Sequence, residues 1–352
     1  MALPSVKHLD KNIQSPESDG QASSRKQDHI ELAFSSSTLA SLADDRFYYE
    51  PMLSGHPSTA LDLSTDLCGR QMQYPLWVSS MTGGTEKARI INHNLAKVCG
   101  NFGLGMGLGS CRQLLYEDKR LEEFDIRGHM PDSPLLINLG IAQVETLLSK
   151  SETARISDLI GKLSADGLII HVNPLQEWLQ PEGDHISQAP LTTISRLMEV
   201  ADYPIVVKEV GQGFGKKSLE ALLDLPLAAV DLAGFGGTNF SKLELKRTDK
   251  QSYDALHAVS RLGHSCQEMI DWVNVLSAER APACKKIIIS GGIKNFLDGY
   301  HLMQKCKLPS IYAQASGFLQ YATDYDALTA YCRLQIEGLR MAHAFLRLKE
   351  DA

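Results

Sequence analysis

Long apolar runs are missing from this chain, and so is any excess of positive charge. No segment approaches the roughly 20 consecutive apolar residues that a membrane-spanning helix needs, and the first 31 residues contain no apolar core of signal-peptide length. The 42 Asp and Glu residues outnumber the 35 Lys and Arg residues, which gives a net charge of −7. Such a chain has no global attraction for nucleic acid or for an anionic membrane. We therefore expect a cytoplasmic protein with neither as a partner, in which local groups hold any bound phosphate.

Cysteine pairs at CxxC spacing are also missing. The seven cysteines are an odd number, which argues against a disulfide framework and against structural zinc. A reducing compartment such as the cytosol fits this pattern. Hydrophobic residues make up 43% of the chain and charged residues 22%, which is ordinary for a globular protein with a sizeable core.

Eight short apolar runs recur from residue 75 onward, each followed by polar or glycine-rich residues and then by a helical stretch. The runs are continuous rather than alternating, which is typical of parallel strands that are covered on both faces. Eight such units predict an α/β protein of the TIM (β/α)8 barrel type, and an open doubly wound sheet is the alternative. The predicted strands lie at 75–80, 103–108, 134–139, 167–172, 204–209, 228–233, 286–291 and 310–315.

Three segments fall outside the repeating pattern. Residues 1–24 are rich in Ser, Gln, Asp and Gly and predict a flexible N-terminal segment. Residues 25–352 then form a single barrel domain that begins with an N-terminal arm. About 50 residues separate the sixth and seventh predicted strands, and this insertion is either a lid over the site or an extra helix without a role in it. The helical segment 327–350 predicts a final barrel helix or a subunit interface.

Glycine-rich turns follow the first, sixth, seventh and eighth predicted strands. Such turns let backbone N–H groups approach a flat or anionic ligand. The turn at 234–238 lacks the third glycine of a GxGxxG dinucleotide fingerprint. The sequences SGG at 290–292 and AQAS at 313–316 follow the last two strands, where TIM barrels hold phosphate groups. They predict a phosphate-bearing cofactor, of which FMN is a common one.

Several chemically versatile side chains follow the fourth predicted strand, in HVNPLQEWLQPEGD at residues 171–184. His171, Asn173 and Gln176 can donate hydrogen bonds to anionic oxygens. Glu177 can hold Mg²⁺, because hard cations take carboxylate oxygens and often bridge phosphates. Four such groups within seven residues favour a functional site over a solvated loop.

Single polar residues end three other predicted strands, and each has a structural alternative. Asn138 predicts either a ligand contact or a buried partner. Arg112 can bind a diphosphate with two parallel hydrogen bonds, or it forms a surface salt bridge. Lys208 can stabilise a developing anion, or it is neutralised by an ion pair with Glu209 or Asp231.

Together these motifs resemble those of type 2 isopentenyl-diphosphate isomerases, the flavin-dependent kind. The resemblance is carried by RKQDHIE, MTGGT, MGLGSCR, HVNPLQEWLQPEGD, VVKEVG, GFGGTNF, SGGIKN and AQASGFL, which span about residues 25–320 in the family's order. It implies a TIM barrel that binds FMN, Mg²⁺ and isopentenyl diphosphate. The implied reaction interconverts isopentenyl and dimethylallyl diphosphate without net redox change, so that NAD(P)H is needed only to reduce FMN. The resemblance also implies a homotetramer or homo-octamer.

The resemblance assigns a role to each matching residue. Reduced FMN is the implied acid and base, assisted by Gln176, Lys208 and His171, and Glu177 is the implied Mg²⁺ ligand. Cys111 stands where the family commonly has Gln. The implied substrate-binding residues are Arg25, Lys26, His29, Ser110, Arg112, His171, Asn173 and Gln176, with the arm and the loop after the sixth strand closing over the site. The implied FMN-binding residues are Thr82, Gly83, Gly84, Ser110, Asn138, Lys208, Thr238, Gly291, Gly292, Ala315 and Ser316.

Three other functions remain open from the sequence. An FMN-dependent oxidoreductase of the same barrel superfamily, such as a 2-hydroxy-acid oxidase, needs a His base and an Arg clamp after the sixth strand, where this chain has GFGGTNF. A flavin-binding protein without activity has no need of HVNPLQE together with RKQDH. A nucleotide enzyme with Cys111 as nucleophile is tested by Cys111→Ser.

Overall fold

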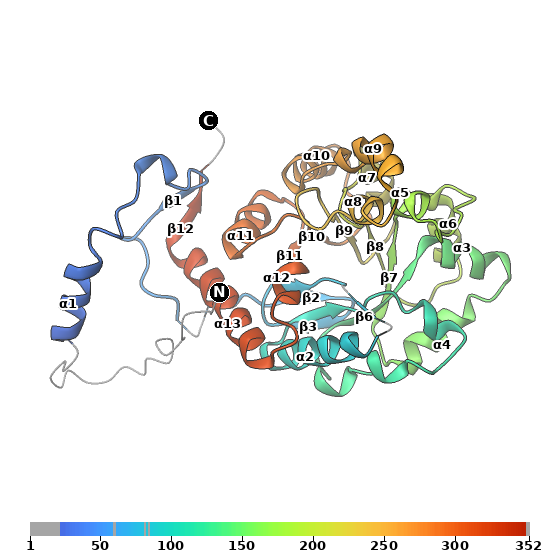
Figure 1. Cartoon of the computed structure of the whole chain (residues 1–352), viewed down its shortest axis with the longest axis horizontal. Helices are drawn as coiled ribbons and strands as arrows, with labels where there is room; N and C mark the ends of the chain where they lie inside the picture. The colour runs from blue at the N-terminus through green and yellow to red at the C-terminus, as the bar shows by residue number, and fades with distance from the viewer. Residues whose placement is uncertain (1–21, 59–60, 81, 84, 350–352) are drawn as a thin grey trace.

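A closed barrel of eight parallel strands forms the centre of the computed structural model, which describes residues 22–58, 61–80, 82–83 and 85–349 (Figure 1). Each predicted apolar run contains one strand, and the strands follow one another around the barrel in chain order. The predicted TIM barrel is confirmed, and the open sheet is wrong. The strands are β4 (Leu76–Val78), β5 (Gly105–Gly107), β6 (Leu135–Gly140), β7 (Gly167–His171), β8 (Ile205–Lys208), β9 (Ala229–Asp231), β10 (Ile287–Ile289) and β11 (Ser310–Gln314).

Helices with clear end signals surround the strands. Thr85 begins α2 by accepting a hydrogen bond from the backbone N–H of Ala88, and Gly103 ends that helix with a left-handed φ of 64°. Asn295 begins α11 in the same way as Thr85 begins α2. The long outer helices are α2 (Glu86–Phe102), α3 (Ile141–Ser149), α4 (Ala154–Lys162), α6 (Pro190–Met198), α7 (Lys216–Leu223), α10 (Cys266–Glu279), α11 (Phe296–Lys305) and α13 (Tyr325–Phe345). No helix in these described ranges has the length and apolar character required to cross a bilayer.

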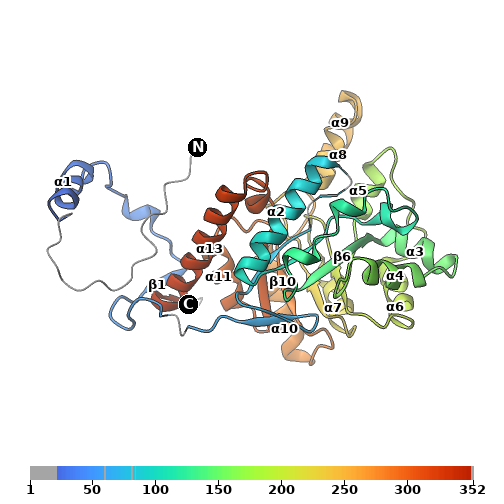
Figure 2. The same cartoon turned by 90° about the horizontal axis from the view of Figure 1, so that it is seen from below.

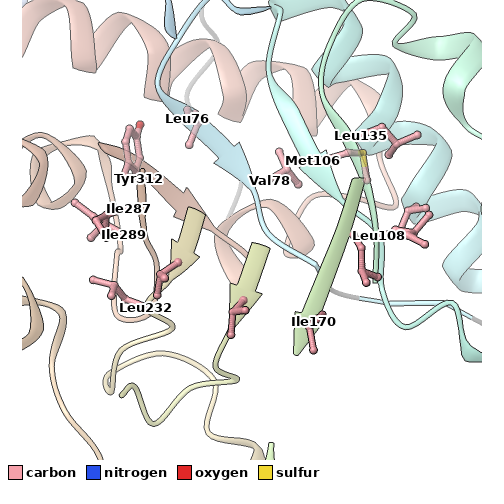
Figure 3. Close-up of a cluster of buried hydrophobic side chains, with 14 of the residues drawn as sticks. Leu76, Val78, Met106, Leu108, Leu135, Ile170, Leu232, Ile287, Ile289 and Tyr312 are labelled. Carbon is pink, nitrogen blue, oxygen red and sulfur yellow. The ribbon is translucent and has the colours of Figure 1, made fainter. Parts of the chain in front are cut away.

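Alternation along the strands separates two apolar layers. Leu76 and Val78 on β4 belong to the larger cluster, which packs between the barrel and the helices (Figure 3). Trp77, between them, points into the barrel interior. The interior cluster also contains Leu67 and Met72 from the hairpin of β2 (Thr65–Leu67) and β3 (Arg70–Met72).

That hairpin closes the amino end of the barrel. Lys286, just before β10, donates hydrogen bonds to Thr65 Oγ1 at 2.9 Å and to the carbonyl oxygen of Asp66. Because the hairpin occupies this end, the opposite end, where the strands finish, is left for a functional site.

The insertion between β9 and β10 lies over the carboxyl end of the barrel. It contains α8 (Phe240–Leu245), α9 (Lys250–Leu256) and the 3-10 helix η5 (His257–Arg261). Helix α8 contacts α5 (Pro174–Leu179), which carries the predicted substrate residues. The insertion therefore lies where the lid interpretation needs it.

The N-terminal arm leaves the barrel beside α11 and α13. Strand β1 (Phe47–Tyr49) pairs antiparallel with β12 (Leu346–Leu348), and Phe47 packs against Tyr300 of α11 with ring centroids 5.8 Å apart. Helix α1 (Ala22–Leu32) lies on the far side of α13 from α5 and α8 in both views (Figures 1 and 2). Residues 1–21, most of the predicted flexible segment, lie outside the described residues. Helix α13 is an outer helix that contacts α2 and α11.

Candidate active site

Three polar side chains form a row across neighbouring strands at the carboxyl end of the barrel. The strand register pairs His171 with Lys208 and Lys208 with Asp231. The residues two positions earlier on these strands belong to the barrel interior. Since side chains alternate along a strand, the row faces the inside of the barrel mouth.

Lys208 is buried at the centre of this row, and its Nζ donates to the carbonyl oxygen of Glu209 at 2.5 Å. Among the described residues no ion pair joins Lys208 to Glu209 or Asp231. Glu209 instead accepts hydrogen bonds from three backbone N–H groups of the following turn at 2.6–2.8 Å. Burial raises the pKa of the Asp231 carboxyl, while the Lys208 charge and the Ser290 hydroxyl oppose that rise. The predicted neutralising ion pair is therefore wrong.

His171 is held as a neutral ring. Its Nδ1 lies 2.6 Å from Asn138 Oδ1, and because an amide oxygen only accepts, Nδ1 carries the proton. Burial and the charge of Lys208 lower the pKa of His171 to about 4. The structure thus gives Asn138 a buried partner, and it leaves the Nε2 atom of His171 unprotonated near neutral pH.

A network of amides and carboxylates surrounds the start of α5. Asn173 donates to Glu177 Oε1 at 2.8 Å, and Glu177 Oε2 accepts from the backbone N–H of Asp184 at 2.7 Å. The Oδ1 atom of Asn173 is buried without a partner in the described residues. Gln176 Nε2 donates to Oε1 of Glu244 on α8 at 3.2 Å. Three of the four predicted residues of this motif, Asn173, Gln176 and Glu177, are thus joined in one network.

Arg112 forms the bidentate contact expected of an arginine, but with a protein carboxylate. Its two terminal nitrogens lie 2.5 and 3.2 Å from the carboxylate oxygens of Asp184. Gln143 donates to the same carboxylate at 2.7 Å and accepts from the backbone N–H of Gly140 at 2.9 Å. The salt-bridge alternative therefore describes Arg112 in this structure.

A cavity of about 260 Å³ opens beside Lys208. It is lined by turns that follow β4, β8, β9, β10 and β11, so it lies at the carboxyl end of the barrel. Ser80, which also lines it, has a buried hydroxyl without a partner among the described residues. Six predicted FMN residues line this cavity: Lys208, Thr238, Gly291, Gly292, Ala315 and Ser316.

Gly291 shows why one of these turns needs glycine. Its φ is 92°, and a Cβ atom there would lie 2.1 Å from the carbonyl oxygen of Gly234. The turns after β9 and β10 therefore pack backbone against backbone, which leaves their N–H groups close to the cavity.

Of the remaining predicted cofactor residues, Asn138 lies on β6, and Thr82, Gly83 and Ser110 lie in the loops after β4 and β5. Thr82 contacts the β5 loop, because a Cβ on Gly109 would lie 2.3 Å from the Thr82 carbonyl oxygen. Gly83 packs against Phe124, and Ser110 is exposed. None of these residues, nor Asn138, lines the 260 Å³ cavity as described. Gly84 lies outside the described residues.

Cys111 is not placed as a nucleophile. Its side chain is completely buried, and burial raises its pKa to about 12. The thiol therefore stays protonated at neutral pH, whereas nucleophilic cysteines need the thiolate. All seven cysteines are free thiols.

The structure does not bring the predicted basic residues of the arm to the mouth of the barrel. Arg25, Lys26 and His29 have exposed side chains on α1, beyond α13. Their distance from the α5 network is evident in Figures 1 and 2.

Several curated proteins of similar sequence share one name. The isopentenyl-diphosphate delta-isomerase of Rickettsia africae (strain ESF-5) is 34% identical over 322 residues, which cover 90% of this chain and 91% of the relative. The protein of the same name from Rickettsia akari (strain Hartford) is 37% identical over 279 residues, which cover 78% and 79%. This chain belongs to the isopentenyl-diphosphate delta-isomerase family. No protein-family model matches it.

Solved structures with the same barrel carry other names. A flavocytochrome b2 variant with sulfite bound has a TM-score of 0.59 at 13% identity and covers 85% of this chain and 72% of its own. A mandelate oxidase variant with an FMN adduct has a TM-score of 0.53 at 11% identity and covers 86% and 88%. At such identities the likeness concerns the fold alone.

The residues of this isomerase-family chain fit both a flavin and a magnesium ion. A buried cation, an unpartnered Ser80 hydroxyl and glycine turns at the 260 Å³ cavity suit a planar ligand with polar edges and a phosphate. For the metal, the described residues contain no group of three or more His, Cys, Asp or Glu ligands. Mg²⁺ at substrate phosphates needs only one or two carboxylates, and Glu177 with the unpartnered Asn173 oxygen meets that requirement.

Sequence reasoning missed Glu244, a buried carboxylate next to Gln176. Arg247 donates to Glu244 Oε2 at 2.6 Å and also contacts Glu182. In the sequence Glu244 and Arg247 belong to a mixed charged stretch, SKLELKRTDK, which resembles a solvated helix face. Only the packing of α8 on α5 reveals their position.

Proposed function

We propose that this chain is a type 2, FMN-dependent isopentenyl-diphosphate isomerase that interconverts isopentenyl and dimethylallyl diphosphate by a 1,3-allylic proton shift. One observation carries the proposal: a cavity suited to a flavin and a cluster suited to a magnesium diphosphate share one barrel mouth. His171 and Lys208, adjacent in register, join the two parts. The sequence relatives support the same reaction.

Residues of the glycine turns would hold the FMN phosphate, and Lys208 would lie beside the N1–C2=O edge of the ring. When bound and reduced by NAD(P)H, FMN would supply the acid and base for the shift. Lys208 would stabilise negative charge that develops next to it. A buried cation that already points at the developing charge does so without reorganisation. Thr82, Gly83, Gly84, Ser110 and Asn138 complete the proposed set of FMN-binding residues.

The diphosphate would lie against the start of α5. Glu177 would hold Mg²⁺, which neutralises the substrate, and Asn173 and Gln176 would donate amide hydrogens to phosphate oxygens. Ser110 and Arg112 approach from the β5 loop, with Arg112 exchanging its Asp184 contact for phosphate. His171 would donate from Nε2, which requires the ring to take up a proton when the anion binds.

Gln176 would face the reacting end of the substrate. An amide is a poor acid, but its Nε2 already donates to Glu244 Oε1 at 3.2 Å. Among the described hydrogen-bond partners of Gln176, Glu244 is thus the titratable one. We assign Gln176 to substrate and Glu244 to the positioning of Gln176.

A cytoplasmic enzyme that works as a homo-oligomer is part of this proposal. The free thiols are supporting evidence for the compartment.

An anaerobic assay tests the function. Purified protein is mixed with FMN, Mg²⁺, isopentenyl diphosphate and either dithionite or NADPH, and dimethylallyl diphosphate is quantified. Product that forms only with reduced flavin is the expected result. No product, despite a bound flavin that NADPH reduces, would refute the isomerase and favour the oxidoreductase alternative.

A further inference from the structure

The N-terminal arm carries apolar side chains that the rest of the chain does not cover. Every residue from 24 to 45 is exposed. Phe34 is 93% exposed, and four further large apolar residues of the arm are also exposed. An isolated helix as short as the 11 residues of α1 is marginal in water without packing. The arm therefore has the composition of a segment that is ordered against another surface.

The exposed apolar surface continues past the arm onto the body of the molecule. Tyr48 and Tyr49 on β1 are 53% and 67% exposed, and Met52 and Leu53 are 89% and 69% exposed. A monomer rarely leaves so long a stretch uncovered. Because this stretch continues directly from the arm, contact with a second molecule would cover both.

The arm joins the barrel on the side opposite to the diphosphate cluster of its own chain. Its root packs on α11, which connects β10 and β11, through Phe47 and through an Arg46–Asp298 ion pair at 2.9 Å. The diphosphate cluster follows β7, which is four strands from β11 in either direction around the barrel. The linking residues 33–46 can span at most about 50 Å, so length alone permits either copy.

Three cations near the diphosphate cluster are already engaged by other groups. Arg112 is paired with Asp184, and Arg247 with Glu182 and Glu244. Within the described part of the chain, Lys208 is the cation of the interior row, where it faces the flavin cavity. The arm carries two permanent cations, Arg25 and Lys26. A mouth that has to bind a polyanion and an arm that presents cations are complementary in charge.

A groove of about 580 Å³ lies beside α5 and offers the arm an apolar seat. Pro174 and Leu175 line it from α5, Leu191 and Ile194 from α6, and Phe214 from the turn before α7. Because the groove borders the start of α5, a helix bound there would lie close to the diphosphate cluster.

From these observations we propose that the arm acts in trans: the arm of one copy binds the 580 Å³ groove of a second copy and brings Arg25, Lys26 and His29 to that copy's diphosphate cluster. The active site is then shared between two chains. Arm and groove are different surfaces, so the contact is head-to-tail, and a closed ring gives every copy one donated and one received arm. The role of the three basic residues rests on the proposed function, whereas the docking of the arm does not.

A cross-linking experiment tests the docking without reference to activity. Phe34 is replaced by the photoreactive benzoylphenylalanine in the full-length holoenzyme, which is then irradiated and digested. We expect cross-linked dimers in which residue 34 of one chain is joined to the groove of another. Cross-links within single chains only, or no link to the groove, would overturn the proposal.

The groove has a matched pair of variants. Leu191→Asp places a charge in the seat and is expected to reduce the cross-link at least tenfold. Val200→Asp places the same charge just after α6, at a side chain 62% exposed that does not line the groove, and should leave the cross-link unchanged. An unaltered cross-link in Leu191→Asp would show that the seat is wrong.

A complementation experiment tests the sharing of the site. The double variant Arg25→Ala/Lys26→Ala and the single variant Glu177→Gln are co-expressed with different tags, and mixed oligomers are purified through both. They are assayed at a Mg²⁺ concentration too low to support the Glu177→Gln site. In trans, about one quarter of the sites combine an intact arm with an intact mouth, so activity should return to that level. In cis every chain is defective, and no recovery would overturn the proposal. A wild-type protein without isomerase activity would refute the function instead and leave the cross-link result standing.

Discussion

At the residue scale, one cation influences all its titratable neighbours. The charge of Lys208 acts to lower the pKa of His171, of Glu209 and of Asp231, and burial opposes this for the two carboxyls but adds to it for the histidine. The row therefore contains a neutral imidazole beside a buried ammonium group. Such a mouth attracts negative charge from a flavin and from a diphosphate.

Replacing Lys208 tests this electrostatic role. Lys208→Met should lower turnover by about 100-fold or more, because a preorganised charge at developing negative charge is lost. The midpoint potential of bound FMN, measured by anaerobic dye titration, should become more negative. Lys285→Met, at an exposed lysine before β10, is the control that should change neither quantity. An unchanged potential in Lys208→Met would contradict the placement of the flavin.

His171 gives a prediction with a definite sign. With a pKa of about 4, the ring is neutral above that pH in the free protein. A bound diphosphate raises the pKa, so binding should take up as much as about one proton near pH 6 and weaken as the pH rises. Calorimetry of isopentenyl diphosphate binding to the oxidised holoenzyme, in two buffers of different ionisation enthalpy, counts the protons. His171→Asn should lose this uptake and retain only the proton change of the phosphate itself. Equal uptake in both proteins would remove His171 from the diphosphate site.

At the element scale, turns and helix starts carry the ligand-binding groups. The turn after β10 depends on glycine because its backbone touches the turn after β9. The start of α5 depends on Asn173, which joins the strand end to Glu177 through one hydrogen bond of 2.8 Å. The two elements are proposed to bind different ligands. A mutation in one should therefore weaken the binding of one ligand and leave the other unchanged.

Gly291→Ala tests the turn. Its Cβ would lie 2.1 Å from a carbonyl oxygen at a φ of 92°, so we expect weaker FMN retention and a lower Tm. Gly161→Ala on α4 is the control, since nothing lies within 4 Å of its Cβ. That change should raise the free energy of unfolding by about 0.5–1 kcal/mol. Thermal unfolding and flavin fluorescence distinguish the two, and full FMN retention in Gly291→Ala would count against the cavity.

Glu177→Gln tests the α5 side. The amide keeps the shape but loses the charge that attracts the metal, so the Mg²⁺ concentration for half-maximal activity should rise at least about tenfold. FMN binding should stay as in the wild type. A titration of activity against Mg²⁺ measures the change, and an unaltered Mg²⁺ requirement would exclude Glu177 as the ligand.

At the scale of the whole molecule, the two ends of the barrel have separate tasks. The β2–β3 hairpin packs Leu67 and Met72 into the interior and closes one end, while the loops at the other end carry the chemistry. Stability and function should therefore be separable by mutation.

Met72→Ala tests this separation. Met72 is 1% exposed within the interior cluster, so its truncation should lower the free energy of unfolding by about 2–5 kcal/mol. The KM for isopentenyl diphosphate should not change, because the cavity forms at the closed end. Urea unfolding and steady-state kinetics measure the two quantities. A large change in KM would show that the two ends are coupled.

The sequence by itself determined the positions of all eight barrel strands, because continuous apolar runs and the glycine turns after them are local signals. It also determined that His171, Asn173, Gln176 and Glu177 lie together, since a strand end and a short helix place them within one or two turns. The six cavity-lining residues that are proposed to bind FMN were predictable for the same reason, because each ends or follows a recognisable strand.

Only the tertiary structure decided which distant groups complete these local sets. Glu244 reaches Gln176 across 68 positions of sequence, and Asp184 reaches Arg112 across 72. No periodicity or spacing reports such a contact, because it depends on how α8 packs on α5 and how the loops cross the mouth. The same holds for Glu209, which accepts backbone hydrogen bonds in place of the alternative ion pair with Lys208. It also holds for the arm, whose basic residues lie away from the mouth of their own barrel. Local sequence fixes local conformation, whereas long-range packing selects the partners of each charged group.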